Sequence, residues 1–243
     1  MFTFLNKAKN HTSLDWLGVD IHSHLLPGID DGSPDVETSL TYVDRLEALG
    51  LRHFYATPHI YMELYPNTAA TIQSALDRLR QQLPPGVQLE AAAEYMVDDT
   101  FETRFTDGKK LMTLPGNHVL IEMSYIAENA RIERIIFELQ VHGYKPVLAH
   151  PERYLFYHGH LGRYEQLKRL GCLFQMNILS PTGYYNPQVK KAAQYLLKRG
   201  MVDFVGTDLH HQKHLTAIEK FVLSGEAHGA FKKNPIKNSA LIT

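Results

Sequence analysis

Seven short apolar stretches alternate with segments of helical spacing along this chain of 243 residues, and this alternation limits its possible folds most. The stretches begin about 27–36 residues apart, which is the length of a strand followed by a helix. Strands that alternate with helices in this way form a parallel sheet, either open or closed into a barrel. The expected strands cover residues 17–22, 51–57, 87–93, 118–123, 145–149, 172–177 and 202–207.

The segments between these strands carry recognisable helix boundaries. Ser33-Pro34 opens a segment in which leucine and valine recur at helical spacing until Gly50. Gly143, Gly171 and Gly200 are typical of later helix ends. The predicted helices lie between Ser33 and Gly50, between Asn67 and Pro84, and over residues 130–142, 161–170, 186–199 and 212–224.

Composition narrows the class of protein. Hydrophobic residues make up 44% of the chain and charged residues 21%, which is ordinary for a globular enzyme. The net charge of −1 and the lack of long basic runs argue against a nucleic-acid partner. Because no apolar stretch approaches the roughly 20 residues of a membrane span, we expect no stable membrane insertion and a cytoplasmic location. The single cysteine, Cys172, excludes an intramolecular disulfide and a cysteine-rich zinc cluster.

No repeat, low-complexity tract or linker divides the chain. We therefore predict one α/β domain over residues 16–243, preceded by a flexible N-terminal leader over residues 1–15. The stretch after residue 225 carries no catalytic signal, and a terminal helix that packs under the sheet or a partner contact would both explain it.

His22-Ser23-His24 closes the first expected strand. Alternation along a strand would place Leu17, Val19 and Ile21 on one face. Asp20 and the two imidazoles would then share the opposite face, where both histidines can bind a single metal ion. Asp20 could orient the His22 ring or cap the strand.

Further metal-binding side chains occur where six of the seven expected strands end. The carboxyl ends of parallel strands meet at one rim, which is where active sites of such folds lie. A lone histidine or carboxylate there is usually structural, but the joint pattern predicts a metal site. Histidine and carboxylate ligands without thiolate suit Mn, Fe or Zn, and their number exceeds the needs of one ion, so we expect two or three. The rim residues are His22, His24, Asp30, Asp31, His59, Glu94, Glu122, His150, Asp208 and His210.

Several blocks of the sequence resemble a known family. Residues 20–32 (Asp-Ile-His-Ser-His-Leu-Leu-Pro-Gly-Ile-Asp-Asp-Gly) are similar to the opening motif of bacterial metal-dependent tyrosine phosphatases of capsule and exopolysaccharide clusters. These enzymes belong to the polymerase and histidinol phosphatase (PHP) superfamily. The block Ala-His-Pro-Glu-Arg-Tyr at 149–154 is equally specific, and residues 57–59, 93–95 and 121–124 agree in order and spacing. The resemblance covers about residues 16–225 and implies a distorted (β/α)7 TIM-like barrel.

The resemblance also implies a trinuclear site with Mn as the expected metal. Carried over by position, the three ligand sets are His22, His24, Glu94 and Asp208; Glu94, Glu122 and His150; and Asp31, His59 and His210. The resemblance makes Glu94, Asp208 and Arg153 the catalytic residues. Arg153 would hold the phosphate, because a guanidinium can pair with two phosphate oxygens at once. Several cations can activate a bridging water as hydroxide for attack on phosphorus and neutralise the leaving oxygen.

The residues themselves predict hydrolysis at a polynuclear metal site, and the resemblance implies a protein-tyrosine phosphatase. The resemblance implies that its substrate is the tyrosine-rich tail of a kinase that controls polysaccharide synthesis and export. A histidinol-phosphate phosphatase or another small-molecule phosphomonoesterase is the nearest alternative, and a non-catalytic metal-binding regulatory domain is the second. The loop Pro27–Gly32 and the block at 149–154 favour the tyrosine phosphatases.

One position departs from the family pattern. Family members often carry an arginine after the block that follows the seventh strand, whereas this chain continues from Asp208 to His214 without one. Either Lys213 or His214 replaces it, or the site relies on Arg153 alone. We expect His211 and His214 to lie on the surface.

The loop tyrosines and the single cysteine are two further candidates for a function. Loop tyrosines, namely Tyr61, Tyr65, Tyr184 and Tyr185, could line a mouth for a phosphotyrosine ring or be ordinary loop residues. A thiol-based phosphatase requires arginine six residues after its cysteine, but Ile178 stands six residues after Cys172. Cys172 is therefore expected to be a buried strand residue.

Overall fold

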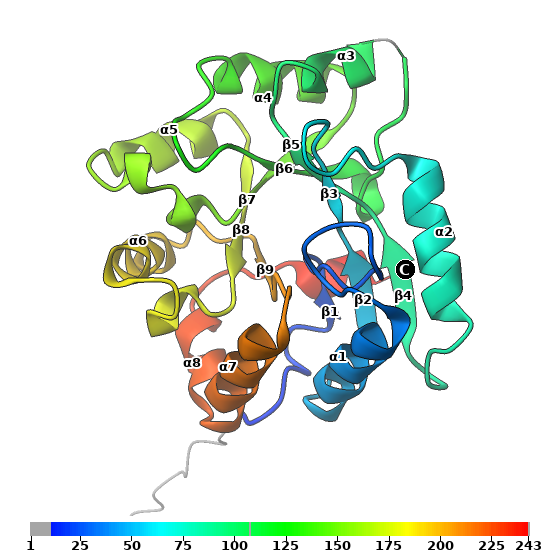
Figure 1. Cartoon of the computed structure of the whole chain (residues 1–243). Coiled ribbons are helices and arrows are strands. Elements are labelled where there is room, and N and C mark those ends of the chain that lie inside the picture. The colour runs from blue at the N-terminus through cyan, green and yellow to red at the C-terminus, as the bar shows by residue number, and fades with distance from the viewer. Residues whose placement is uncertain (1–10, 107, 243) are drawn as a thin grey trace, which may run out of the picture.

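Nine parallel strands form the centre of the protein in the computed structural model, which describes residues 11–106 and 108–242 (Figure 1). One sheet has the order β1 (Val19–Asp20), β2 (His53–Ala56) and β4 (Gln88–Ala91). The other has the order β3 (His59–Ile60), β5 (Glu94–Met96), β6 (His118–Glu122), β7 (Lys145–Ala149), β8 (Leu173–Asn177) and β9 (Phe204–Gly206). A mixed α/β fold with parallel sheets is thus confirmed.

Two of the seven expected strands are each followed by a second, short strand. The strand expected at 51–57 contains β2, and β3 follows it after Pro58, which has no N–H to donate. The strand expected at 87–93 contains β4, and β5 follows it. Pairing continues across the gap, because Ala92 N donates to Ala56 O (2.9 Å) and Glu94 N donates to Pro58 O (3.1 Å). The strands β3 and β5 were not expected, and their pairing places His59 directly opposite Glu94.

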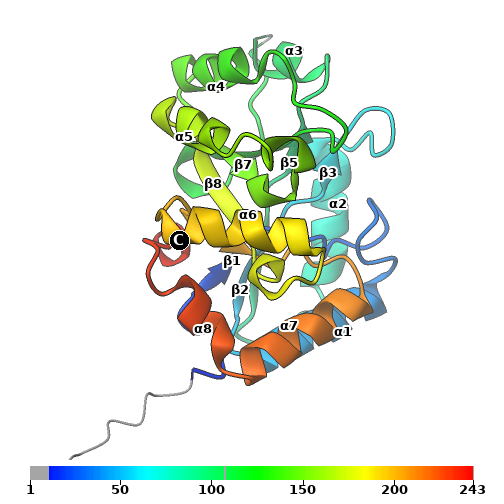
Figure 2. The same ribbon diagram turned by 90° about the vertical axis from the view of Figure 1, so that its left-hand side faces the viewer.

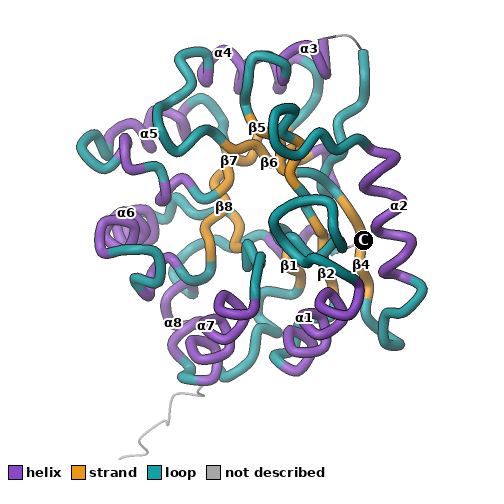
Figure 3. Tube along the Cα trace, viewed as in Figure 1, coloured by secondary structure: helices purple, strands orange, loops and turns teal. Residues whose placement is uncertain are grey.

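The segment after β1 connects the two sheets. Asp208 N donates to His22 O (2.7 Å) and His24 N donates to Leu209 O (3.1 Å), which ties this segment to the residues after β9. On its other side, Thr57 N donates to Ser23 O (2.8 Å). Figure 3 shows the resulting arrangement, in which strands surround a common centre and helices lie outside them.

Eight α-helices lie outside the strands in the described part of the chain (Figures 1 and 2). The six predicted helices are confirmed as α1 (Val36–Ala48), α2 (Ala69–Arg80), α4 (Ile132–Val141), α5 (Gly162–Arg169), α6 (Pro187–Lys198) and α7 (Gln212–Leu223). The sequence did not reveal α3 (Phe101–Thr106), and it only suggested α8 (Glu226–Phe231), because each spans six residues and shows little periodicity. Among the described helices, none is long and apolar enough to cross a membrane.

Apolar side chains form two clusters. The larger one lies between the strands and the helices, and the smaller one gathers side chains from strands of both sheets, including Tyr55 and Phe204. Leu241, near the C-terminus, packs into the smaller cluster, and Tyr55 Oη donates to its carbonyl oxygen (3.2 Å). Asn238 donates to the carbonyl oxygens of Val19 and Val205. The C-terminal segment therefore covers the strands on the side opposite their carboxyl ends.

The first expected strand is shorter than predicted. Leu17 lies in the larger cluster, whereas Val19 and Ile21 lie in the smaller one, so these three residues do not share a face. Alternation fails at Leu17 because β1 begins only at Val19, after Gly18 in a left-handed conformation (φ 78°). Of the expected leader, residues 1–10 lie outside the described part of the chain, and Leu14 is fully buried.

Candidate metal centre

The nine residues named as metal ligands lie together beyond the carboxyl ends of the strands. Glu122 ends β6, and His59 and Glu94 begin β3 and β5, whose starts lie beyond the ends of β2 and β4. The ligand atoms form four overlapping groups, and within each group they lie within 4.8 Å of one another. The groups are His22, His24 and Asp208; His22, Glu94 and His150; His59, Glu94 and Glu122; and His24, Asp31, His59 and His210.

Glu94 occupies the centre of this cluster and is fully buried. Its Oε2 atom lies 3.2 Å from His22 Nε2, 3.4 Å from His24 Nε2 and 3.2 Å from His59 Nδ1. Its Oε1 atom lies 3.2 Å from His150 Nε2. Neither oxygen has a hydrogen bond of normal geometry. A buried carboxylate left in this way is costly, whereas cations between it and the imidazoles would satisfy it, so the donor set fits metal ions.

Hydrogen bonds on the outer side of the imidazoles orient three of them. His22 Nδ1 lies 2.8 Å from Gln175 Oε1, and His24 Nδ1 lies 2.7 Å from Asp30 Oδ2. His210 Nδ1 lies 2.8 Å from the Asp208 carbonyl oxygen. These acceptors favour the proton on Nδ1 and leave the Nε2 lone pair directed into the cluster, as in metal sites. The Nε2 atoms of His22 and His24 lie 3.4 Å apart, and two such lone pairs need a cation between them.

Gln175 takes the role that the sequence offered to Asp20. The Asp20 carboxylate accepts hydrogen bonds from Thr207 N (3.0 Å) and Thr207 Oγ1 (2.5 Å) and does not orient the His22 ring. Gln175 was missed because it is neither acidic nor a histidine. Its place at an inward position of β8, the one strand without a predicted ligand, was the available signal.

Opposing charges control proton binding in the cluster. Burial alone would raise the pKa of Glu94, but the imidazoles of His22 and His59 outweigh it and hold that pKa well below its usual range. Burial and His24 lower the pKa of His59, yet Glu94 and Glu122 raise it to about 9. Burial together with His24 lowers the pKa of His210 to about 4. Metal ions that bind here would displace protons, because imidazole ligands must be neutral.

The backbone is specialised at four positions around the cluster. His150 and Asp208 adopt left-handed conformations (φ 32° and 51°), which are uncommon for non-glycine residues and cluster at functional sites. A Cβ atom on Gly32 would lie 2.2 Å from the His24 carbonyl oxygen. A Cβ atom on Gly206 would lie 2.5 Å from His22 Cβ. Gly32 therefore leaves the space that His24 occupies, and Gly206 leaves the space that His22 occupies.

Arg153 stands beside the cluster. Its Nη1 atom donates to Asp208 Oδ2 (2.9 Å), and its guanidinium lies between the rings of Tyr125 and Tyr185, at 4.9 and 4.5 Å from their centroids. The preceding residue, Glu152, is buried and accepts hydrogen bonds from Asn177 N and Ser180 Oγ. These contacts hold the turn that carries Arg153, so its guanidinium is fixed where it can bind an anion.

A cavity of about 630 Å³ opens over the cluster and Arg153. All four loop tyrosines named from the sequence line it, namely Tyr61, Tyr65, Tyr184 and Tyr185. Tyr125 lines it as well and was not predicted. The expectation that His214 lies on the surface was wrong, because this residue is 7% exposed, faces the cavity and packs near Tyr184. His211 also lines the cavity but is exposed, as expected, and it accepts a hydrogen bond from His214 N as the N-cap of α7.

Two other residues lie outside this cavity. Lys213 is exposed and is not among the residues that line it. Cys172 is buried, as expected, and burial raises the pKa of its thiol to about 12. The geometry therefore gives no support to thiol chemistry.

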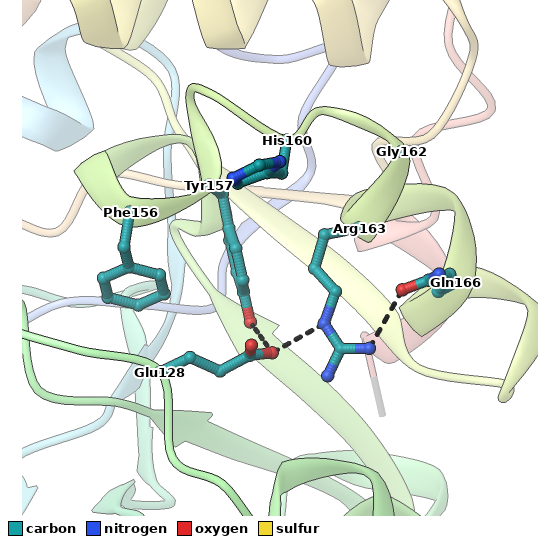
Figure 4. A pocket seen from close by; sticks show the side chains of 7 residues that line it. All are labelled: Glu128, Phe156, Tyr157, His160, Gly162, Arg163 and Gln166. Carbon is teal, nitrogen blue, oxygen red and sulfur yellow. Dashed lines mark hydrogen bonds and ion pairs between the residues drawn. The ribbon is translucent and has the colours of Figure 1, made fainter.

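Figure 4 shows a second hollow, of about 470 Å³, that shares no lining residue with the cavity over the cluster. Tyr157 Oη (2.8 Å) and Arg163 Nε (2.7 Å) both donate to Glu128 Oε1 (Figure 4). Glu128 belongs to the loop between β6 and α4, which also carries Tyr125. The contacts in this hollow thus fasten the loop that supplies one side of the Arg153 site.

Comparison with known proteins agrees with this geometry. The family described as "Capsular polysaccharide synthesis, CpsB/CapC" matches residues 18–219. The chain belongs to this family. Among CpsB/CapC relatives, the tyrosine-protein phosphatase YwqE of Bacillus subtilis is 28% identical over 205 residues, which cover 80% of this chain and 78% of YwqE. The tyrosine-protein phosphatase CpsB of Streptococcus pneumoniae is 26% identical over 206 residues, covering 79% of this chain and 83% of CpsB.

The fold of this CpsB/CapC protein also matches a solved structure. The matching chain comes from work on YwqE from Bacillus subtilis and CpsB from Streptococcus pneumoniae, described there as unique metal-dependent tyrosine phosphatases. The TM-score is 0.75 at 26% identity, over 90% of this chain and 96% of the solved one.

Proposed function

We propose that this protein is a metal-dependent phosphatase that hydrolyses phosphotyrosine in proteins. The observation that carries the proposal is the position of Arg153, which lies beside a cluster of nine potential ligands, six of them buried, and lines the same cavity as the loop tyrosines. The names of the family relatives support the same activity. A phosphate placed over the cluster would meet a fixed guanidinium, and an aromatic ring attached to it would meet Tyr125, Tyr185 and the other tyrosines.

The three ligand sets divide the cluster as follows: His22, His24, Glu94 and Asp208; Glu94, Glu122 and His150; and Asp31, His59 and His210. Two or three divalent ions bound there, with Mn as the expected metal and Fe or Zn as the other candidates, would supply an activated water and neutralise phosphate charge. Glu94 serves two sets through its two oxygens. Asp208 holds one set through Oδ1 and anchors Arg153 through Oδ2. Arg153 binds the phosphate oxygens and orients the phosphorus toward the cluster.

We also propose the finer fold. The seven strand regions correspond to a distorted (β/α)7 barrel. Hydrogen bonds between the residues that follow β2 and β4 connect these strands to β3 and β5, and the segments after β1 and β9 are hydrogen-bonded to each other. The parallel sheets and the outer helices support it. The barrel domain would cover residues 16–243.

The proposed physiological substrate is the phosphorylated tail of a tyrosine kinase that controls capsule or exopolysaccharide synthesis and export, and the proposed location of this protein is the cytoplasm. The family description supports the link to capsular polysaccharide. A protein tail is a suitable substrate because the cavity is open enough for its lining side chains, among them Tyr184 and Ile126, to be exposed.

The deciding experiment is phosphate release by the purified protein with Mn²⁺, from a phosphotyrosyl peptide and from histidinol phosphate in parallel. We expect preference for the peptide, and loss of turnover after chelation. Glu94→Gln and His150→Ala should each abolish turnover, whereas Glu90→Gln, an exposed glutamate on β4, should leave it unchanged. Preference for histidinol phosphate would establish the small-molecule alternative, and metal binding without turnover of either substrate would establish a regulatory domain.

A further inference from the structure

Exposed apolar side chains surround the cavity over the cluster. Leu64, Tyr125, Ile126 and Tyr184 line that cavity, yet between 38% and 92% of each side chain is exposed. These residues come from three separate loops. Apolar residues gathered around a site in this way are typical of a surface that contacts a partner.

A smaller pocket adjoins the cavity. It has a volume of about 290 Å³ and is lined by Tyr125, Arg153, Leu155, Tyr185, Asn186 and Val189. Three of these residues, Tyr125, Arg153 and Tyr185, also line the cavity, so the stacked guanidinium and its two rings form a wall common to both. Ligand pockets usually measure about 300–1,000 Å³, so this pocket suits one side chain.

The chemistry of this side pocket selects its occupant. No carboxylate lines it, and the guanidinium of Arg153 would repel a cation. Leu155 is 55% exposed and forms an apolar wall that has no role in the cluster. Successive Cα atoms are about 3.8 Å apart, so a residue one or two positions from a phosphotyrosine held by Arg153 can reach this pocket.

We infer that the side pocket is a specificity subsite, which binds an apolar side chain adjacent to the phosphotyrosine of the substrate polypeptide. The inference rests on the proposed phosphatase function and names Leu155 as its specificity-determining residue. Leu155 acts in binding the polypeptide only. It therefore contributes to turnover of peptides and contributes nothing to turnover of free phosphotyrosine.

The test compares three substrates: free phosphotyrosine, a phosphotyrosyl peptide flanked by leucines, and the same peptide flanked by serines. We expect the wild-type protein to show a kcat/KM about tenfold higher for the leucine peptide than for the serine peptide, since one buried apolar group commonly gives about 10–200-fold discrimination. Leu155→Ser should reduce this ratio to about one. Leu223→Ser is the matched control, because Leu223 is 60% exposed on α7 and lines neither space.

The outcomes separate the subsite from the phosphatase function. Equal kcat/KM values of the wild-type protein for the two peptides would overturn the subsite while leaving the phosphatase function intact. An unchanged ratio in Leu155→Ser, or an equal loss of free phosphotyrosine turnover, would overturn it as well. A wild-type protein that hydrolyses none of the three substrates would overturn the proposed function, and the subsite with it.

Discussion

Arg153 and Asp208 are joined by a hydrogen bond of 2.9 Å from Nη1 to Oδ2, while the other oxygen of Asp208 lies 3.4 Å from His22 Nε2. One carboxylate therefore connects the guanidinium that faces the cavity with the imidazoles of the cluster. Burial of Asp208 would raise its pKa, but His22, His210 and Arg153 outweigh this effect and lower the pKa. The carboxylate stays ionised, as both of its roles require.

Replacement of Arg153 should impair phosphate binding and leave the cluster able to hold metal. Arg153→Lys keeps the charge but loses the planar fork and the stacking between Tyr125 and Tyr185. We expect kcat/KM to fall about 10- to 100-fold, the equivalent of one lost charge-assisted hydrogen bond. Steady-state kinetics combined with elemental analysis of bound metal would measure both effects. Unchanged kinetics in this variant would remove Arg153 from the site.

Asp30 is expected to tune metal affinity although it is not among the nine ligands. Its Oδ2 atom accepts the Nδ1 proton of His24, and Asp30→Asn would weaken the preference for the tautomer that directs Nε2 into the cluster. Metal affinity should fall about 10- to 100-fold, as is usual for such outer partners. Competition with a chromogenic chelator would measure it. Asp44→Asn, an exposed change on α1, should leave the affinity at the wild-type value.

We expect that Gly206 does not tolerate replacement even by alanine. The Cβ atom of Gly206→Ala would lie 2.5 Å from His22 Cβ and 2.9 Å from Gln175 Nε2. We expect a loss of about 1–3 kcal/mol in the free energy of unfolding and reduced metal uptake, because His22 must move. Chemical denaturation and metal titration would test this. The control is Gly159→Ala, whose Cβ meets nothing within 4 Å; equal behaviour of the two variants would contradict the prediction.

Cys172 should be inert and dispensable. Burial raises the pKa of its thiol from 9.0 to about 12, so the native protein keeps the thiol proton while the unfolded chain loses it above about pH 9. The contribution of this thiol to the free energy of unfolding is therefore fully present below about pH 9 and is lost as the pH rises toward 12. We expect no alkylation of the native protein by iodoacetamide at pH 8 and full activity in Cys172→Ser. Rapid labelling, detected by mass spectrometry, would show that the thiol is accessible.

Much of the fold followed from local sequence patterns. The helices α1, α2 and α6 were predicted because each has a recognisable boundary, such as Gly50 after Leu49 or Gly200 after Arg199. The strands β3 and β5 were missed. They span only two and three residues, which is too short for periodicity to reveal them.

The sequence by itself determined which side chains could meet at the carboxyl ends of the strands, because parallel strands bring their ends to one rim whatever their detailed register. The partners that orient these side chains were decided only by the tertiary structure. Gln175 reaches His22 across 153 positions of sequence, and His214 faces the cavity because α7 packs beside it. Such contacts depend on the packing of whole elements, and a local pattern of residues carries no record of that packing.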